Sequence, residues 1–330
     1  MSAAPTPTID ACGPQRAART LPFTAPTLLA PMEGVTEPCF RDLVLTRNDA
    51  AALGGAFTEF VRVSIAPVPR SLVRRHLGPS RFPQPVGVQL MGNHLAHLAQ
   101  TARHAVEAGV PLIDLNFGCP ARGAVSGCVG SALLREPATL EGVVRAVVDA
   151  VSVPVTAKIR AGYADASQIE DLARAAENGG AALLTVHCRT RAEGYCDAVD
   201  WTRIARAVRA VSIPVCGNGG IRTHADLARM RHETGAAFAM VGRGALADPW
   251  IFGGRAVSRG GAARFLVDYV DTMNARLALR PRGCVARVKQ LLRHWTAGGL
   301  VPDDATRTRW LREQDGDALL AWLRNAADEA

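Results

Sequence analysis

The segment Leu112-Ile-Asp-Leu-Asn-Phe-Gly-Cys-Pro120 is an apolar run that ends in a turn carrying an amide and a thiol. A buried strand brings the side chains at its end to a defined point in space, and here these are Asn116 and Cys119. The Asn116 amide can donate and accept hydrogen bonds, so it can recognise the edge of a planar heterocycle. The Cys119 thiol can give up a proton. Alternatively, Cys119 packs as a small buried hydrophobe, as free cysteines commonly do.

This segment is one of eight strand-like runs that alternate with helix-like segments. The runs are Thr27–Pro31, Gly55–Phe60, Val86–Gly92, Leu112–Gly118, Val153–Ile159, Ala182–His187, Ile213–Gly217 and Ala237–Val241. Helical patterns between them include Leu95–Ala108, Leu140–Ala150, Ile169–Asn178 and Ala225–His232. Continuous apolar runs are typical of parallel strands covered on both faces, and eight β/α units predict a (β/α)8 TIM barrel over residues 27–255. A doubly wound sheet is the alternative, but it would normally carry a Gly-rich phosphate turn after its first strand.

Polar or reactive residues follow nearly every predicted strand. They are Met32, Glu59, Gln89, Asn116 with Cys119, Lys158, His187, Asn218, and Gly242 with Arg243. In a barrel these positions share the carboxyl-terminal face, where active sites lie. The Gly-rich turns Cys216–Gly220 and Val241–Gly244 follow the seventh and eighth strands, where many barrels bind a phosphate group.

Residues 256–330 have a helical pattern, which predicts a second, helical domain. Helices are expected over Ala262–Leu279, Gly283–Ala297 and Asp304–Asn325, with the tryptophans at 295, 310 and 322 packed inside this bundle. From Arg255 to Arg312 there are twelve basic and four acidic residues. This excess predicts a polyanionic partner, although an ordinary solvated surface is the alternative.

The composition, with 48% hydrophobic and 21% charged residues, is that of a globular protein without a membrane span. Residues 1–26 are rich in Ala, Pro and Thr and predict a disordered tail rather than a signal peptide. The eight cysteines form no CxxC pair, which predicts no metal site and a reducing, cytoplasmic location. Only Lys158 and Lys289 among the 38 basic residues are lysines. Each is therefore a candidate for a task that a planar guanidinium cannot perform.

Several motifs together make the chain resemble the tRNA-dihydrouridine synthases, flavin enzymes that reduce uridine in tRNA. The matching stretches are Ala30-Pro-Met-Glu-Gly34, Gly87-Val-Gln-Leu90, Leu115-Asn-Phe-Gly-Cys-Pro120, Ala157-Lys-Ile-Arg160, Val186-His-Cys-Arg-Thr190, Gly217-Asn-Gly219 and Val241-Gly-Arg-Gly-Ala245. They occur in family order and span the predicted barrel, and the Asn-x-Gly-Cys-Pro element is highly specific.

The resemblance implies FMN on the carboxyl-terminal face of the barrel and NADPH (or NADH) as the reductant. Matched positions for the cofactor are Ala30, Pro31, Met32, Gln89, Lys158, His187, Asn218, Gly219, Gly220, Gly242 and Arg243. It also implies that Asn116 contacts the target uracil and that Cys119 is the proton donor in the reduction of the C5–C6 double bond.

Further stretches resemble the bacterial C-type subgroup, whose members act on uridine 16 in the D-loop. They are Thr58-Glu-Phe-Val-Arg-Val63, Glu193-Gly-Tyr195 with Val199-Asp-Trp201, and Val285-Ala-Arg-Val-Lys-Gln290. This resemblance implies tRNA contacts at Arg62, Tyr195, Arg287 and Lys289, with His294 where the subgroup has an aromatic phenol.

The chain departs from the family pattern at Gly220, where an acidic residue is usual, and at Cys128, where relatives have Gly. We expect a monomer. A small-molecule FMN oxidoreductase of the dihydroorotate or dihydropyrimidine dehydrogenase type, and a non-catalytic RNA-binding protein, are the alternatives.

Overall fold

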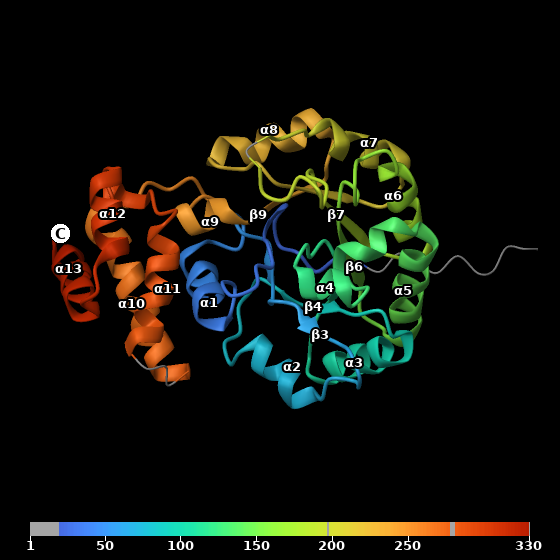
Figure 1. Cartoon of the computed structure of the whole chain (residues 1–330), viewed down its shortest axis with the longest axis horizontal. Coiled ribbons are helices and arrows are strands. Elements are labelled where there is room, and N and C mark those ends of the chain that lie inside the picture. The colour runs from blue at the N-terminus through green and yellow to red at the C-terminus, as the bar shows by residue number, and fades with distance from the viewer. Residues whose placement is uncertain (1–19, 197, 278–280, 330) are drawn as a thin grey trace, which may run out of the picture.

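The computed structural model describes residues 20–196, 198–277 and 281–329, and its centre is a closed parallel barrel (Figure 1). The strands are β1 (Thr27–Leu29), β2 (Gly55–Phe57), β3 (Val61–Arg62), β4 (Val86–Met91), β5 (Ile113–Phe117), β6 (Val155–Arg160), β7 (Leu183–His187), β8 (Val215–Asn218) and β9 (Phe238–Val241). All pairings are parallel, and β1 pairs with both β2 and β9 while β2 pairs with β4, which closes a ring of eight strands. The predicted TIM barrel is therefore confirmed.

The second predicted run, Gly55–Phe60, is not one continuous strand. Both β2 and β3 pair with the same strand β4, with Phe57 opposite Gly87 and Val61 opposite Leu90. Four steps along one chain match three along the other, so one extra residue bulges from the ladder. The break turns Phe60 toward a cavity and leaves Arg62 exposed.

Helices cover the outside of the barrel (Figure 1). They are α1 (Pro38–Arg47), α2 (Arg70–Leu77), α3 (Leu95–Glu107), α5 (Pro137–Ala150), α6 (Ile169–Asn178), α7 (Thr202–Ala210), α8 (His224–Thr234) and α9 (Arg243–Ala247). The short helix α4 (Arg122–Ser126) instead lies beside the carboxyl-terminal mouth, in front of the strands in Figure 1. Local sequence explains the ends of the helices. For example, α8 begins at a capping box of Thr223 and Asp226 and ends at Gly235 in the left-handed conformation.

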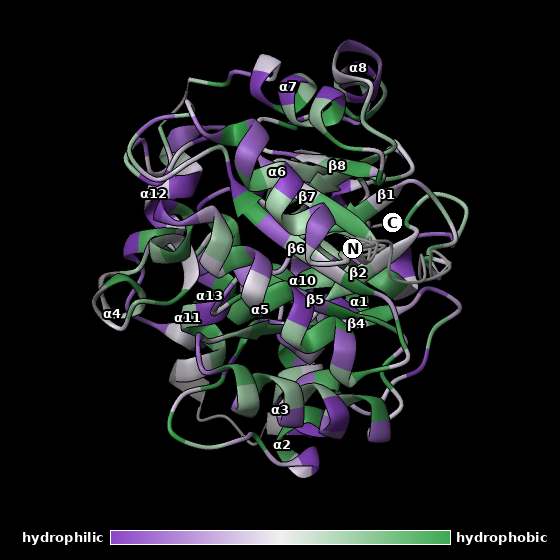
Figure 2. Cartoon of the chain, turned by 90° about the vertical axis from the view of Figure 1, so that its right-hand side faces the viewer, coloured by the Kyte–Doolittle hydropathy of each residue, from purple (hydrophilic) through white to green (hydrophobic). Residues whose placement is uncertain are grey.

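The barrel interior has an apolar floor at the amino-terminal ends of the strands. Leu28, Phe57, Leu112, Leu183 and Met240 pack there, while alternate residues such as Leu29 face the helices. Figure 2 shows this hydrophobic centre and the mixed outer surface of the helices. Most of the predicted tail lies outside the described residues, but its residues 20–26 are placed. Phe23 closes the floor, with its ring centroid 6.0 Å from that of Phe57 and 5.6 Å from that of Phe238.

The carboxyl-terminal region is a helical bundle of α10 (Arg259–Leu277), α11 (Pro281–Leu292), α12 (Asp304–Arg312) and α13 (Gly316–Asp328). The single helix predicted over Asp304–Asn325 is wrong, because Asp315 accepts hydrogen bonds from the amides of Asp317 and Ala318 and starts a new helix. The tryptophans pack the bundle as predicted: Trp295 is fully buried, and the rings of Trp310 and Trp322 stack with centroids 4.5 Å apart. No helix in the described part of the chain is long and apolar enough to span a membrane.

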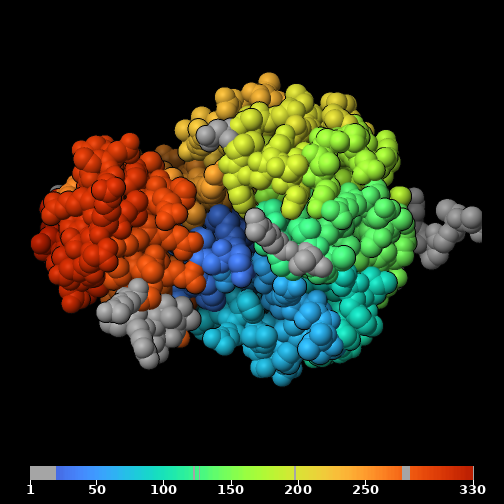
Figure 3. All heavy atoms as spheres, in the orientation of Figure 1, coloured from blue at the N-terminus to red at the C-terminus, as the bar shows by residue number. Residues whose placement is uncertain are grey.

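Helix α1 lies between the barrel and the bundle (Figures 1 and 3). The ring of Phe40 meets Phe265 and Tyr269 of α10 edge-on, at centroid distances of 6.1 and 6.0 Å. The Tyr269 hydroxyl donates to Glu37 Oε1 at 2.7 Å, and Arg276 pairs with Asp42 at 2.6 Å. One hydrophobic core therefore includes residues of both regions, and a domain boundary near residue 255 remains a prediction.

Candidate active site

A cavity of about 800 Å³ opens at the carboxyl ends of the strands. All eleven residues predicted to bind the cofactor line it, and so do Asn116, Cys119, Tyr195 and His294. The remaining three predicted RNA contacts, Arg62, Arg287 and Lys289, do not. Parallel strands explain the convergence, because the register places Asn116 beside Lys158 and His187 beside Asn218 at the same rim of the barrel.

A chain of hydrogen bonds runs from a buried carboxylate to the Cys119 turn. Gln89 donates its amide Nε2 to Asp114 Oδ2 at 2.6 Å and accepts from Asn116 Nδ2 at 2.7 Å. The Asn116 side-chain oxygen then accepts from the backbone amides of Gly118 and Cys119, at 3.0 and 2.9 Å. An ionised carboxylate only accepts hydrogen bonds, so Asp114 sets the orientation of both amides along this chain.

Cys119 differs from the other barrel cysteines in its surroundings. It is half-buried at the cavity wall, against a small apolar cluster of Met91, Ala124 and Val129. Cys216 is fully enclosed in the barrel, where burial raises its thiol pKa to about 12. Cys128 is exposed. Among the described residues that line the cavity, Cys119 is the one cysteine, so its thiol has access to a ligand there.

Lys158 is held inside the barrel by a hydrogen bond to Asn218. Its ammonium donates to Asn218 Oδ1 at 2.9 Å, and Asn218 in turn donates to the carbonyl oxygen of Met240 at 2.8 Å. Burial lowers the pKa of Lys158 to about 8, against the opposing attraction of Asp114. Burial likewise raises the pKa of Asp114 to about 6. The attraction between the two groups, and the hydrogen bonds that Asp114 accepts from Gln89 and Thr156, oppose this burial and favour the charged form of both.

His187 is neutral at physiological pH. Burial lowers its pKa well below the ordinary value, and the neighbouring cations Lys158 and Arg160 lower it further. Its Nδ1 atom is buried without a hydrogen-bond partner within the described structure. A neutral imidazole at the cavity wall can accept or donate one hydrogen bond to a bound molecule.

The turn after β8 leaves no room for side chains at its two glycines. Gly219 and Gly220 have φ values of +102° and +80°. A Cβ atom at Gly219 would lie 2.8 Å from Cys188 Sγ, and one at Gly220 would lie 2.6 Å from Val199 Cγ1. A side chain at position 220 would therefore require Val199 to move. The backbone of this turn is thus free to approach a ligand closely.

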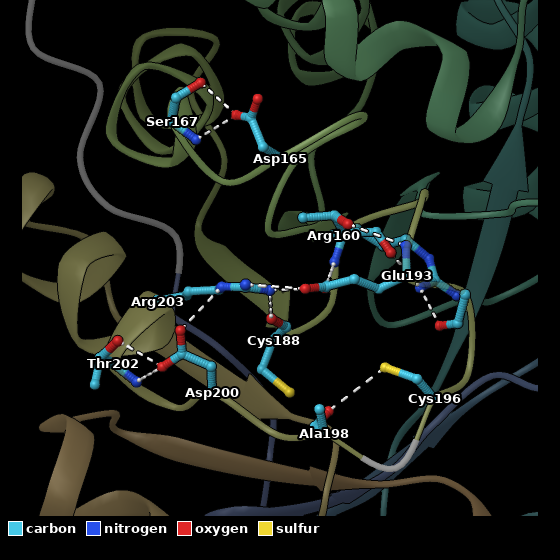
Figure 4. Close-up of polar contacts among 12 residues, drawn as sticks. Arg160, Asp165, Ser167, Cys188, Glu193, Cys196, Ala198, Asp200, Thr202 and Arg203 are labelled. Carbon is cyan, nitrogen blue, oxygen red and sulfur yellow. Dashed lines mark hydrogen bonds and ion pairs between the residues drawn. The ribbon is translucent and has the colours of Figure 1, made fainter.

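Tyr195 lies in a loop that is held by two arginines, Arg160 and Arg203, whose contacts Figure 4 shows. Arg160 donates to the carbonyl oxygens of Thr190 and Gly194 at 3.0 and 2.9 Å. Glu193 forms a bidentate ion pair with Arg203, which lowers the pKa of Glu193 to about 2. The Tyr195 side chain is 60% exposed, so a rigid loop presents an aromatic ring at the cavity mouth.

The predicted RNA contacts outside the cavity have internal partners. Arg287 donates to the carbonyl oxygen of Gly34 in the loop after β1, and Lys289 donates to the carbonyl oxygen of Glu313 at the end of α12. Arg62 is exposed and donates to Gly123 at 3.2 Å. His294 is half-buried at the cavity, where burial and Arg243 lower its pKa.

Sequence reasoning missed Asp114, Arg160 and Arg189. Asp114 precedes Asn116 by two positions on a strand, so its side chain had to face the same interior. Arg160 follows Lys158 at the same spacing. Seven charged residues line the cavity, and only Glu33 among them is acidic; the others are Lys158, Arg160, Arg189, Arg222, Arg243 and Arg293. No group of three or more His, Cys, Asp or Glu side chains in the described ranges could hold a metal ion.

A parallel barrel with a polar, mainly cationic cavity at the carboxyl ends of its strands is typical of enzymes that act on anionic ligands. The sequence profile of the dihydrouridine synthase (Dus) family matches residues 28–280, which include all of the barrel except the first residue of β1. The chain belongs to this family and is an oxidoreductase.

Curated relatives extend the similarity. A tRNA-dihydrouridine(16) synthase of Cupriavidus necator is 42% identical over 68% of this chain and 71% of its own length. A tRNA-dihydrouridine(16) synthase of Pseudomonas putida is 35% identical over 89% of this chain and 95% of its own length. A tRNA-dihydrouridine synthase B of Xanthomonas axonopodis is 40% identical over 68% of this chain and 67% of its own length.

Proposed function

We propose that this chain reduces the C5–C6 double bond of uridine in tRNA to 5,6-dihydrouridine, with FMN as the bound cofactor and NADPH (or NADH) as the reductant. The observation that carries the proposal is the hydrogen-bonded chain from Asp114 to the Cys119 turn beside the Lys158 ammonium. It brings a proton donor and a buried cation to one cavity.

The cavity residues fit FMN. The Gly219–Gly220 turn offers backbone amides without side chains, and Arg243 adds a cation at the next turn, which suits a phosphate group. The neutral His187 imidazole and the Lys158 ammonium, both on the cavity lining, suit the polar edge of the flavin ring. A volume of about 800 Å³ is typical of a cofactor site with space for a second ring.

When bound, FMN supplies the hydride for this reduction. The chain's own contribution is the other hydrogen: the Cys119 thiol gives its proton to C5 of the uracil, leaving a thiolate that is reprotonated before the next turnover. Asn116 has one amide N–H that is not used by Gln89, and we assign it to the uracil edge. The target base must leave the RNA stack to enter the cavity, at a cost of a few kcal/mol.

We infer that the target is uridine 16 in the D-loop. Relatives named for this position include the Pseudomonas putida protein, whose similarity covers most of the bundle as well as the barrel. Dihydrouridine should be mapped along tRNA from a strain that lacks this gene. Loss at position 20 or 47 with position 16 unchanged would contradict this position while leaving the reaction intact.

The decisive experiment is mass spectrometry of nucleosides from unmodified tRNA incubated with the protein, FMN and NADPH. We expect dihydrouridine that is absent when either tRNA or NADPH is omitted. Rapid NADPH turnover on free pyrimidines without RNA would instead favour a small-molecule oxidoreductase. A purified protein that binds tRNA but no flavin would favour a non-catalytic RNA-binding protein. We further propose that the protein acts in the cytoplasm as a monomer, which gel filtration with light scattering can test.

A further inference from the structure

We propose that an arginine surface on the barrel binds the phosphate backbone of tRNA outside the target loop. This surface, called here the α2 surface, consists of Arg62, Arg70, Arg74, Arg75 and Arg81. The inference rests on the proposed function, because tRNA is the polyanion that this enzyme would meet. Arg62 is already an expected contact with tRNA, and the inference adds Arg70, Arg74, Arg75 and Arg81 of α2 and the loop that follows it.

The α2 surface comes from a part of the chain without acidic residues. Residues 60–106 contain no Asp or Glu, yet they contain six arginines and four of the eight histidines. Residues 136–235, on the other side of the barrel, contain twelve acidic and twelve basic residues. A balanced surface is the ordinary arrangement for a soluble protein, so the one-sided segment needs a separate explanation.

The arginines of the α2 surface are exposed and have no carboxylate partner within the described residues. The recorded contacts of Arg62 and Arg81 are to backbone carbonyl oxygens. Elsewhere on the barrel, exposed arginines commonly pair with acids: Arg145 with Glu141 at 2.6 Å and Arg174 with Asp171 at 3.1 Å are examples. The α2 surface therefore keeps its guanidinium groups available for another molecule.

The fold does not need these arginines. Helix α2 is anchored by its buried residues Val73 and Leu77. Its last carbonyl groups accept hydrogen bonds from the buried guanidinium of Arg41, to His76 at 3.1 Å and to Leu77. Arg70 and Arg74 lie one turn apart with like charges, which disfavours a helix. Binding to a polyanion would offset this repulsion.

The α2 surface extends from the cavity mouth toward the bundle. Arg62 contacts Gly123 in the loop that follows Cys119. At the other end, Arg276 of α10 donates to Ser80, next to Arg81, and also pairs with Asp42 of α1. Figure 1 shows α1 between the bundle and the barrel, with α2 on the adjacent side. A substrate far larger than the cavity would therefore meet the bundle and the α2 surface together.

The guanidinium group suits the proposed partner. Its planar fork donates two hydrogen bonds to one phosphate, and such contacts orient a nucleic acid without recognising its sequence. Each neutralised phosphate also releases counterions, so each contact contributes to the dependence of binding on salt. The α2 surface should thus position tRNA and leave the chemistry in the cavity unchanged.

The test compares two triple variants of the full-length protein. In one, Arg70, Arg74 and Arg75 are replaced by Ala. In the matched control, three exposed arginines of the balanced side, Arg145, Arg174 and Arg209, are replaced by Ala. The dissociation constant for tRNA is measured from 50 to 300 mM salt. We expect the α2 variant to lose about 10²-fold in affinity at 0.1 M salt and its salt slope to fall by about 2, while the control retains both.

Two further measurements separate the possible reasons for a loss. The KM for tRNA should rise while kcat at saturation is retained, and the preference for whole tRNA over an isolated D-arm hairpin should disappear. Replacing only Arg74 and Arg75 by Gln keeps the helix propensity of α2 and should reduce the salt slope by about 1 to 2. This milder variant is decisive if the triple variant does not fold.

The inference is overturned if the α2 variants bind tRNA with wild-type affinity and salt slope. It is also overturned if they lose binding to phosphatidylserine vesicles alone, because the surface would then serve a membrane. The proposed function fails separately, if the wild-type protein forms no dihydrouridine in tRNA.

Discussion

The cavity and the bundle both carry many cations but use them differently. In the cavity, Lys158 and Arg160 are enclosed and held by neutral oxygens, from Asn218, Thr190 and Gly194. In the bundle, Arg259 and Arg264 pair with the carboxylates of Glu329 and Asp328. Lys289 is bonded within the bundle, and Arg287 reaches across to the barrel.

This difference shows that a charge count is a poor guide to a binding surface. The cations on the described lining of the cavity outnumber its one acidic residue, Glu33, so an anionic ligand can become their partner. Much of the basic excess of the bundle is instead compensated by carboxylates and carbonyl groups of the same chain. Changes in the cavity should therefore affect chemistry strongly, and single changes in the bundle should have small effects on binding.

The largest expected effect is that of Cys119→Ala. Loss of a positioned acid commonly costs about 10²–10⁴-fold in rate, and the variant should still bind FMN because the thiol acts only on the uracil. Single-turnover formation of dihydrouridine by mass spectrometry measures the rate, and flavin absorbance measures the cofactor. Near-wild-type turnover would show that another group donates the proton, and Cys128→Ala is the matched control.

A smaller loss is expected for Asp114→Asn, which replaces one carboxylate oxygen by an NH2 donor, so that the side chain can no longer accept from both Gln89 and Thr156. The amide can then turn, and the hydrogen bonds to Asn116 and to the Cys119 turn are weakened. Misplacement of a reacting group by about 1 Å can cost 10²-fold, so we expect kcat to fall by about 10–10²-fold with little change in tRNA affinity. An unchanged kcat together with an unchanged flavin spectrum would contradict a positioning role for Asp114.

Lys158 should make flavin binding dependent on pH. Its pKa is lowered to about 8, so the ammonium is present below that pH and is lost above it. We expect FMN affinity to fall by about 10-fold between pH 7 and 9.5, because deprotonation removes a charged hydrogen-bond donor to the flavin ring. Fluorescence titration of FMN measures this change. Lys158→Met should bind FMN weakly at both pH values, and a wild-type pH dependence in that variant would assign the effect to another group.

The smallest effect is expected for Arg287→Ala combined with Lys289→Ala. Because both side chains already donate to backbone oxygens of this chain, they should contribute less to RNA binding than free cations. We expect tRNA affinity to fall by a few-fold and the salt slope by less than 2, the value for two complete phosphate contacts. A loss larger than that of the α2 variant would show that the bundle is the main RNA-binding surface.

The barrel and its cavity could be predicted because all parallel strands of a barrel end at the same face, whatever the exact positions of the surrounding helices. The eight apolar runs were sufficient to predict that Gln89, Lys158 and Asn218 lie together at the carboxyl-terminal face of the barrel. The bulge after Phe57 could not be predicted, because one extra residue changes register without changing the apolar pattern. The break between α12 and α13 was missed because Asp315 acts as a cap only in its local geometry. The ion pairs and hydrogen bonds of the bundle cations depend on tertiary contacts, so they cannot be predicted from the number of charges in the sequence.

The position of α1 has a consequence for the synthesis of the chain. Phe40 belongs to the first β/α unit, but its partners Phe265 and Tyr269 are more than 220 residues further along the sequence. At about 5–20 residues per second, a ribosome needs on the order of 10–40 s to produce them. During that time the nascent barrel exposes an apolar face that only the last part of the chain can cover. Translation arrested before residue 260 should therefore give a nascent chain that binds chaperones, and extension past residue 275 should release it.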